Sequence, residues 1–470
     1  MNEYEAFDGL GLAGLVKRGE VKAEELVQAA WQRTQQRNPA LNAVVTPLFD
    51  TARAQARTAL AAGPFEGVPF LVKELVASVA GVATTFASRL YAGNVASADS
   101  EIVARFRRAG LVIVGKTNSS EFGLSPATES HLYGITRNPW REDLSPGGSS
   151  GGSAAAVSAG IVPVAHATDG GGSIRIPASC CGLFGLKPTR ARVTSGPEGG
   201  EGLSGLAMQH VVSRSVRDSA AMLDAVAGAM PGDPYVAPPP ARAYLAEVST
   251  PPGRLLIAFA RTAPSGVPLH PDCVSAVEDA ARLCESLGHE VQEASPQFDA
   301  EAMRAGFGLI FSAHTMANVG RATGGVLPDP QLVEPLTYAL AERGKHISAA
   351  EFIGAVHGLH RQSRRVAQFF ERYDLWLTPT LAQPPMPIGH FDIDSGDFDA
   401  WLAQLDAFLP FTYPCNVTGQ PAMSVPLFWS AEGLPIGCQF AARYGDESLL
   451  FRLAGQLEQA RPWFNRRPPI

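Results

Sequence analysis

Apolar residues recur along the chain in two alternating patterns, one typical of amphipathic helices and the other of buried strands. In the segment DSEIVARFRRAGLVIVG, residues 99–115, apolar side chains first stand three and four positions apart and then form an uninterrupted run. Asp99 is the expected N-cap of the helix and Gly110 its expected end. The segment therefore predicts a helix that leads directly into a buried strand.

The same order of helix and strand recurs elsewhere in the chain. PDCVSAVEDAARLCESLGHEVQEA predicts a helix with Pro271 in its first turn and Gly288 after its end, followed by a strand. A further helix is expected over residues 22–36 and should end before Asn38 and Pro39. The runs PFLVK, RLLIAFA and DLWLTPT predict buried strands. This alternation is typical of an α/β fold whose sheet is covered by helices on both faces.

The chain shows no internal repeat, which disfavours a solenoid, and no clear linker between independent domains. We expect a single domain over residues 1–470. Two stretches rich in glycine and proline, 195–205 and 230–244, are predicted to be loops within it rather than linkers between domains. The region of about 230–345 is expected to cover the core and to contribute to a substrate pocket. The sequence does not decide whether 195–205 acts as a lid.

Composition and charge exclude several classes of protein. The 470 residues are 46% hydrophobic and 18% charged, which is typical of a globular protein with a large core. The formal net charge of -7 and the lack of a long basic run disfavour a nucleic-acid partner. The most apolar long run, 154–167, is too short to span a bilayer, and the first residues form no apolar targeting segment. We therefore expect a cytoplasmic protein without a membrane partner.

Cysteine and histidine positions give no sign of a metal site. The six cysteines show neither a CxxC pair nor a disulfide rhythm, so free and mostly buried thiols are expected, the adjacent Cys180 and Cys181 included. The histidines form no HExxH motif. We expect no metal and no other cofactor.

Two loops rich in glycine and serine flank one apolar segment and are the main candidates for chemistry. The first, SPGGSSGGS, begins at Ser145, and the second, DGGGS, ends at Ser173. A helix and a returning strand between them would bring Ser149 close to Ser173. The GxSxG match centred on Ser149 lacks the apolar strand that precedes a nucleophile elbow. The GxxxxGKT match at 110–117 is itself a predicted strand, which leaves no loop to hold a phosphate.

The remaining interpretation makes Ser173 a nucleophile. The three glycines before it, Gly170, Gly171 and Gly172, lack Cβ atoms. The backbone can therefore turn sharply and direct successive N–H groups at one point, as an oxyanion hole requires.

A serine nucleophile needs a base, and the residues offer two lysines. Only His166 stands near Ser173 in the sequence, whereas Lys73 and Lys116 each end an apolar run. Burial at these positions would lower the pKa of a lysine and make its neutral amine available as a base. The residue pattern alone does not choose between Lys73 and Lys116.

The motifs, taken together, resemble the amidase signature family. They include GVPFLVKEL, GKTNSSEFG, SPGGSSGGSAAAVSAG, DGGGSIRIPASCCGLFGLKPT and, near the C-terminus, VTGQPAMSVP. The resemblance covers most of the chain, with a signature core over about 65–225, and it implies a large central mixed β-sheet. Within the family, the sequence is similar to members that cleave cyclic nylon oligomers, aryl acylamides and urethanes.

The resemblance implies a role for each residue of the two loops. It makes Ser173 the nucleophile, Ser149 a bridging serine with a cis peptide bond and Lys73 the base, and it thereby decides between the two lysines. The implied oxyanion donors are the backbone N–H groups of Gly170, Gly171, Gly172 and Ser173.

The residues around the glycine loop are also given roles by the resemblance. Asp169 and Arg175 are expected to pair and hold the loop, and Thr128 is expected to support the bridging serine. Gly170 stands where many family members carry a side chain, so the loop should be roomier beside the acyl group. The segment 304–320 is either a wall of the acyl pocket or a core helix. Its candidate pocket residues are Phe307, Ile310, Phe311 and His314.

These implications define a hydrolase of uncharged, fairly hydrophobic amides. Ser173 would attack the carbonyl, its proton would pass through Ser149 to neutral Lys73, and water would hydrolyse the acyl-enzyme. The same triad would serve a carbamate or ester hydrolase, and the glutaminase subunit of a glutaminyl-tRNA amidotransferase is a further alternative. The expected partner is a small-molecule amide or carbamate. The sequence leaves open whether the enzyme forms a homodimer.

Overall fold

Eleven strands lie side by side in one mixed sheet. The computed structural model describes residues 3–470, and the order of the strands is β1-β3-β2-β6-β8-β7-β12-β13-β11-β9-β10. The sheet contains both parallel and antiparallel pairs: β2 is parallel to β3 and β6, whereas β8 is antiparallel to β6 and β7. The strands are β1 (Val44–Pro47), β2 (Pro69–Lys73), β3 (Val112–Thr117), β6 (Val164–Asp169), β7 (Phe184–Lys187), β8 (Met208–Ser213), β9 (Leu256–Phe259), β10 (Glu290–Glu293), β11 (Leu375–Pro379), β12 (Ala422–Trp429) and β13 (Pro435–Ala442), with β4 (Glu129–Ser130) and β5 (Gly134–Ile135) in a separate hairpin.

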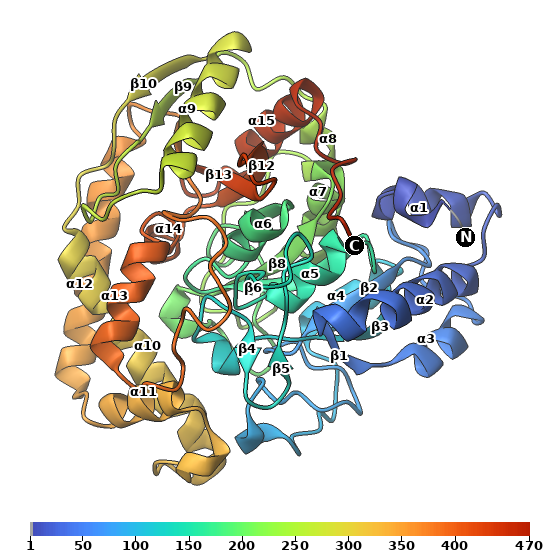
Figure 1. Ribbon diagram of the computed structural model, residues 1–470, viewed down its shortest axis with the longest axis horizontal. Coiled ribbons are helices and arrows are strands. Elements are labelled where there is room, and N and C mark those ends of the chain that lie inside the picture. The colour runs from blue at the N-terminus through green and yellow to red at the C-terminus, as the bar shows by residue number, and fades with distance from the viewer. Residues whose placement is uncertain (1–2) are drawn as a thin grey trace.

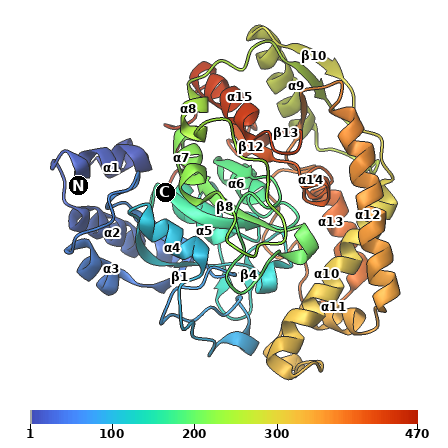
Figure 2. The ribbon, with the colours of Figure 1, turned by 180° about the vertical axis from the view of Figure 1, so that it is seen from behind.

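Helices cover the sheet on both faces, as the views from the front and from behind show (Figures 1 and 2). This confirms the predicted α/β class. The helices are α1 (Gly9–Lys17), α2 (Ala23–Leu41), α3 (Phe49–Ala56), α4 (Glu101–Arg108), α5 (Gly151–Ser158), α6 (Arg175–Cys181), α7 (Val216–Val226), α8 (Tyr244–Val248), α9 (Pro271–Ser286), α10 (Ala300–Thr323), α11 (Pro335–Lys345), α12 (Ala349–Phe369), α13 (Phe398–Phe408), α14 (Tyr413–Thr418) and α15 (Glu447–Ala460).

The helix and strand predicted over 99–115 are present as α4 and β3, but the predicted cap is wrong. Ser100, not Asp99, is the N-cap residue of α4. The Asp99 carboxylate instead accepts hydrogen bonds from the Ala80 N–H and the Arg107 guanidinium. These partners lie in another loop and at the far end of the helix, so a local pattern of cap residues does not reveal them. Gly110 follows the helix with a positive φ of 90°, as expected for its end.

The end of α2 also differs from the prediction, since the helix continues through Pro39 to Leu41. Proline gives up one intrahelical hydrogen bond, but this loss falls near the helix end, where few bonds follow. The Asn38 side chain accepts hydrogen bonds from the N–H groups of Ala43 and Val44 and donates one to the Val44 carbonyl. Burial of Leu41 and these contacts with the following strand stabilise the last turn.

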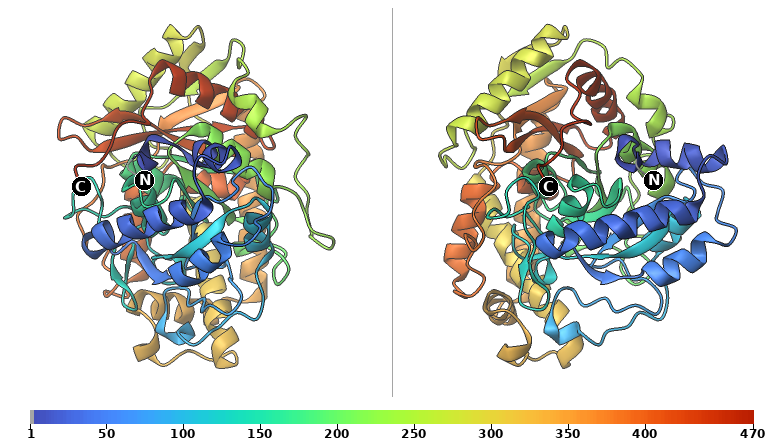
Figure 3. Two further views of the ribbon diagram at one scale, coloured as in Figure 1. Left: turned by 90° about the vertical axis from the view of Figure 1, so that its right-hand side faces the viewer. Right: turned by 45° about the vertical axis from the view of Figure 1, so that its right-hand side comes forward.

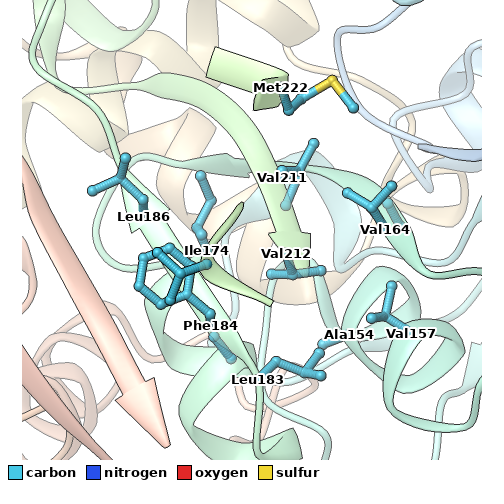
Figure 4. Close-up of a cluster of buried hydrophobic side chains, with 14 of the residues drawn as sticks. Ala154, Val157, Val164, Ile174, Leu183, Phe184, Leu186, Val211, Val212 and Met222 are labelled. Carbon is cyan, nitrogen blue, oxygen red and sulfur yellow. The ribbon is translucent and has the colours of Figure 1, made fainter. Parts of the chain in front are cut away.

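The core between the sheet and its helices is built from small and branched apolar side chains. Figure 4 shows the cluster in which Ala154 and Val157 of α5 meet Val164 of β6 and Val212 of β8. All four side chains are fully buried. Close packing at this point fixes α5 against the strands and so fixes the loop that leads into it.

Helices α10, α11 and α12 pack together at one side of the molecule (Figures 1 and 3). The strands β9 and β10 extend the sheet, so residues 230–345 contribute to both the sheet and this group of helices. The stretches 195–205 and 230–244 are largely irregular, as predicted, although Tyr244 already begins α8. Within residues 3–470, the structure has no helix of the length and apolar character that crossing a membrane requires.

Candidate active site

Two neighbouring parallel strands end at the same edge of the sheet. Lys73 is the last residue of β2 and Asp169 the last residue of β6, and Leu71 pairs with Ala165 where the two strands meet. Because parallel strands present their carboxyl ends together, Lys73 and the glycine loop after Asp169 lie close in space. The site is therefore assembled where the two strands end.

The Lys73 amine lies between two hydroxyl groups. Its Nζ is 2.8 Å from Ser149 Oγ and 2.8 Å from Thr168 Oγ1, and it donates a hydrogen bond to each. All three side chains are buried. Burial lowers the pKa of Lys73 well below its ordinary value, and the negative charge of Asp169 only partly opposes this shift. The amine therefore loses its proton more easily than an exposed lysine does.

The loop that carries Ser149 is held on both sides. Thr128 Oγ1 donates to the Gly147 carbonyl at 2.9 Å and accepts from the Gly151 N–H at 3.1 Å. Ser150 Oγ bonds both the N–H and the carbonyl of Thr168, each at 3.2 Å. The Gly148–Ser149 peptide bond is cis. The hydrogen bonds of Ser150 thus join the first loop to the end of β6, next to Asp169, where the second loop begins.

The second candidate lysine has different surroundings. Lys116 Nζ forms an ion pair with the Glu74 carboxylate at 2.8 Å and donates to the Ala83 carbonyl and the Thr84 hydroxyl. Burial lowers the pKa of Lys116, but the Glu74 charge favours the protonated form. The amine is therefore held by a counter-ion and two further acceptors, and no serine of the two loops is among its partners.

His166 is not placed as a base for Ser173. It lies in the middle of β6 with its ring fully buried, and its Nδ1 accepts a 3.4 Å hydrogen bond from the Lys73 backbone N–H. Burial, together with the nearby charge of Lys73, lowers the pKa of His166 to about 3. The ring is neutral in the ordinary pH range and packs edge-on against Phe106 of α4.

The glycine loop presents free backbone donors. Among residues 3–470, none of the N–H groups from Gly170 to Ser173 is engaged in a hydrogen bond. The Ser173 hydroxyl likewise has no hydrogen-bond partner within the described chain, and Ser173 is half-buried, two residues before α6 begins at Arg175. Within residues 3–470, the four N–H groups and the hydroxyl are therefore not used in hydrogen bonds of the protein itself.

A buried ion pair lies beneath the loop. The Arg175 guanidinium binds the Asp169 carboxylate in a bidentate manner, with both N···O distances at 2.9 Å, and both residues are fully buried. Burial alone would raise the pKa of Asp169, but Arg175 outweighs it and holds that pKa below its ordinary value. Arg175 also donates to Gln439 Oε1 and Asn416 Oδ1, each at 2.7 Å. The loop thus starts from a carboxylate that is fixed by charge and by hydrogen bonds.

Two of the four candidate pocket residues lie against the glycine loop. A Cβ on Gly171 would stand 3.0 Å from Cζ of Phe307, and one on Gly170 would stand 3.7 Å from Cζ of Phe311 and 2.9 Å from Cδ1 of Leu203. Ile310, also in α10, is buried in a hydrophobic cluster of the core. His314 is half-buried and shares a 2.8 Å hydrogen bond with the Ser204 hydroxyl, which ties α10 to the end of the 195–205 loop.

Several site residues were not identified from the sequence. Thr168 stands five residues before Ser173, and its contact with Lys73 depends on the pairing of β2 with β6. Thr412 and Asn416 contact the loop, and Gln439 contacts Arg175, from the C-terminal part of the chain, more than 200 residues away. The motif VTGQPAMSVP, which follows Asn416 directly, was the only nearby signal.

The described residues offer no cluster suited to a metal. Within residues 3–470, no group of three or more histidine, cysteine or acidic side chains is placed to hold an ion. All six cysteines are free and buried, as the sequence predicted.

Comparison with known proteins defines the family. Residues 25–451 match the amidase family, and the chain belongs to it. The 6-aminohexanoate-cyclic-dimer hydrolase of Paenarthrobacter ureafaciens is 39% identical to this chain. The alignment covers 98% of this chain and 96% of the relative. This membership confirms the predicted class of enzyme, an amide-bond hydrolase.

Solved structures agree with this assignment. A 6-aminohexanoate cyclic dimer hydrolase complexed with substrate superposes with a TM-score of 0.93, at 37% identity and 99% coverage of both chains. A bacterial aryl acylamidase of the amidase signature family superposes with a TM-score of 0.87, at 25% identity over 97% of this chain and 96% of that one. The fold predicted from the motifs, an amidase-signature fold with a large mixed sheet, is therefore confirmed.

Proposed function

We propose that the enzyme hydrolyses amides by means of a Ser173-Ser149-Lys73 triad. Ser173 Oγ attacks the carbonyl carbon, and its proton passes to Ser149 while the Ser149 proton passes to the neutral Lys73 amine. Lys73 then returns a proton through Ser149 to the leaving nitrogen, and the C–N bond breaks. Water attacks the resulting acyl-enzyme with the same groups as base, which regenerates Ser173 and releases the acid.

The observation that carries this proposal is the contact between Lys73 and Ser149 in a buried site. A 2.8 Å separation allows direct proton transfer between the amine and the hydroxyl. A base must be neutral at the working pH, and burial favours the neutral amine of Lys73. Lys116 meets this requirement less well, because Glu74 opposes the effect of burial on the Lys116 pKa.

The free N–H groups of the glycine loop fit the oxyanion role. The developing charge on the carbonyl oxygen needs donors that are already oriented, and each such donor contributes about 3 kcal/mol in comparable sites. Gly170, Gly171, Gly172 and Ser173 supply unpaired N–H groups in one short turn. We assign the oxyanion hole to this turn, with Asp169 and Arg175 as its support and Thr128 as the support of Ser149.

The apolar surroundings of the loop favour an uncharged, fairly hydrophobic substrate. Phe307 and Phe311 pack against each other with ring centroids 4.5 Å apart and ring planes tilted by 34°, and Phe307 also packs against Tyr413 at 5.2 Å. Relatives named as 6-aminohexanoate-cyclic-dimer hydrolases support cyclic as well as linear amides. We propose that α10 forms one wall of the acyl pocket, within the cover formed by residues 230–345 of a single domain.

A panel of matched substrates tests the reaction class. An anilide, a carbamate and an ester with acyl groups of equal size should be compared by kcat/KM, in the intact enzyme and in Ser173→Ala. We expect clear turnover of the anilide, and loss of all three activities in Ser173→Ala. Ser286→Ala, which removes an exposed hydroxyl on α9, serves as the matched control and should retain full activity.

Three outcomes would contradict the proposal. An ester rate far above the rates for both nitrogen leaving groups would assign the enzyme to ester hydrolysis. A carbamate rate far above that of the anilide would favour a urethane-cleaving enzyme with the same triad. Anilide turnover that survives in Ser173→Ala would remove Ser173 from the nucleophile position.

A further inference from the structure

The carbonyl groups of the glycine loop are held by donors that lie outside the loop. Thr412 Oγ1 donates to the Gly171 carbonyl at 2.7 Å, and Asn416 Nδ2 donates to the Asp169 carbonyl at 2.9 Å. The Ile176 N–H donates to the Gly172 carbonyl, also at 2.7 Å. Three of the peptide planes around the loop therefore have a fixed carbonyl.

A fixed carbonyl also fixes the direction of the next N–H. In a planar trans peptide the C=O and N–H bonds point in opposite directions. The only cis peptide bonds among residues 3–470 are Gly148–Ser149 and Gly196–Pro197, so the loop peptides are trans. When Thr412 holds the Gly171 carbonyl, it thereby directs the Gly172 N–H to the opposite side. Asn416 does the same for the N–H of Gly170.

We propose that Thr412 is a positioning residue for the oxyanion hole, acting through the Gly171 carbonyl to orient the Gly172 N–H. The inference rests on the proposed function of the loop. Asn416 has the corresponding role for Gly170, but its amide also donates to the Asp169 carboxylate and the Leu206 carbonyl. The role of Thr412 is easier to test, because a single hydroxyl on its buried side chain makes the contact with the Gly171 carbonyl.

The surroundings of Thr412 fit such a role. Its own carbonyl accepts a 2.9 Å hydrogen bond from Arg175, and Gln439 donates to the neighbouring Phe411 carbonyl at 2.9 Å. Hydrogen bonds thus connect the Asp169–Arg175 ion pair to the segment that contains Phe411 and Thr412. The alternative acceptor for the Thr412 hydroxyl, the Leu409 carbonyl, is farther away at 3.3 Å.

Gly172 is the loop residue that makes this approach possible. Its φ of 139° lies in a region that favours glycine, and a Cβ there would stand 2.6 Å from Thr412 Oγ1. The hydroxyl therefore occupies the space that a side chain on Gly172 would need. The position of the Thr412 hydroxyl therefore requires a glycine at position 172.

The test compares three substitutions of Thr412 in the full-length enzyme. Thr412→Ser keeps the hydroxyl, Thr412→Val keeps the size without the hydroxyl, and Thr412→Ala removes both without adding a carbon near the Gly171 carbonyl. We expect kcat for an anilide to fall about 10-fold to 100-fold in the alanine and valine variants, with KM changed less than about 2-fold. Thr412→Ser should stay within about 2-fold of the unsubstituted enzyme. Thr418→Ala, at the end of α14, is the control.

A second readout separates orientation from a general loss of structure. A trifluoromethyl ketone with the acyl group of the substrate forms a hemiketal whose oxyanion needs the same donors. Its inhibition constant should weaken in parallel with the loss of kcat/KM in the alanine and valine variants, while the thermal midpoint of all four variants identifies any that fail to fold.

The outcomes distinguish this inference from the proposed function beneath it. If Ser173→Ala is inactive but folded Thr412→Ala and Thr412→Val keep full kcat and full inhibitor affinity, the positioning role of Thr412 is wrong and the triad stands. If the serine variant loses as much kcat as the alanine variant, the hydroxyl is not the operative group. If Ser173→Ala retains turnover, the proposed function itself fails.

Discussion

Lys73 and Lys116 both end apolar strands, yet their surroundings give them different chemistry. Lys73 contacts two neutral hydroxyls, and Lys116 contacts the Glu74 carboxylate. A buried amine without a counter-ion loses its proton at a lower pH than one beside a carboxylate, because burial penalises the charged form. The difference comes from the neighbours of each lysine and not from the strand pattern that both share.

The pH dependence of turnover should reflect the lowered pKa of Lys73. Since the neutral amine is the active form, kcat/KM rises as the pH passes upward through this pKa and then reaches a plateau. Burial places the midpoint well below the ordinary lysine value of 10.5. The measurement is a pH profile of kcat/KM with an anilide of constant charge. An activity that continues to rise up to the pH at which exposed lysines titrate would contradict the assignment.

The glycines before Ser173 should differ in their tolerance of alanine. Gly170→Ala brings a Cβ to 2.9 Å from the flexible end of Leu203, which can move aside, so we expect a folded enzyme with reduced turnover of bulky acyl groups and retained turnover of acetyl groups. Gly172→Ala meets both an unfavourable φ and the Thr412 hydroxyl, and it should lose roughly 1–3 kcal/mol of stability together with most activity.

Denaturant unfolding and a two-substrate assay of the same variants check this comparison. Equal stability of the two alanine variants would mean that the loop tolerates a side chain at Gly172. An unchanged ratio of bulky to acetyl turnover in Gly170→Ala would remove Gly170 from the determinants of acyl preference.

The Asp169–Arg175 ion pair connects β6 to α6 and is the main polar contact between these two elements at the site. Asp169→Asn leaves the buried Arg175 charge without its counter-ion, which typically costs about 3–5 kcal/mol. The folded pKa of Asp169 is lowered, so its contribution to stability is complete above the unfolded carboxyl pKa and is lost as the pH falls through the folded one.

Denaturant titrations at several pH values measure both effects. At pH 7 the Asp169→Asn variant should unfold at a clearly lower denaturant concentration than the unsubstituted enzyme. The gap between the two should narrow in acid, below the pKa of an ordinary carboxyl group. A gap that widens toward low pH would contradict the stabilising role of the charged pair.

Strong local patterns predicted several strands of the sheet and the helices next to them. The apolar runs that end at Lys73 and before Lys116 are β2 and β3, and the helix that starts at Pro271 is α9. Predictions that depended on distant partners were less accurate. Asp99 binds the Ala80 N–H instead of capping α4, and α2 passes through Pro39 because Asn38 and Leu41 are held by the next strand and the core.

The candidate site shows the same division between local and distant information. The residues of the two loops could be proposed from their glycine-rich motifs, but the choice between Lys73 and Lys116 required a resemblance to known proteins. Thr168 and Thr412 could not be inferred, because their contacts arise from strand pairing and from a segment that returns to the loop from the C-terminal part of the chain.

At the scale of the whole molecule, the two ends of the chain meet at one side of the sheet. Trp463 donates its indole N–H to the Arg214 carbonyl, and Arg467 donates to the Glu5 carbonyl at 2.7 Å. Arg214 itself donates to Glu5 and to Phe464. Arg214 follows the last residue of β8, whereas Met208 at the other end of β8 pairs with Asp169 at the site.

Trp463→Ala should therefore destabilise the enzyme without changing its chemistry. Trp463 is 3% exposed, and loss of a buried tryptophan typically costs about 3–5 kcal/mol. Because the length of β8 separates Trp463 from the catalytic loop, kcat measured well below the melting temperature should stay within about 2-fold of the unsubstituted enzyme. The thermal midpoint measures the loss of stability, and kcat at low temperature measures the chemistry. A large loss of kcat in the folded variant would contradict the prediction and show that Trp463 is coupled to the site.

The central claim, that Ser173 carries the acyl group, is tested most directly by locating the covalent intermediate. A slowly deacylating ester is mixed with the enzyme, the reaction is quenched in acid, and the adduct is mapped by peptide mass spectrometry. The account predicts one acyl group per chain, on Ser173. This adduct should form much more slowly in Lys73→Ala and not at all in Ser173→Ala. An adduct on a different side chain, or an adduct of equal yield in Ser173→Ala, would contradict it.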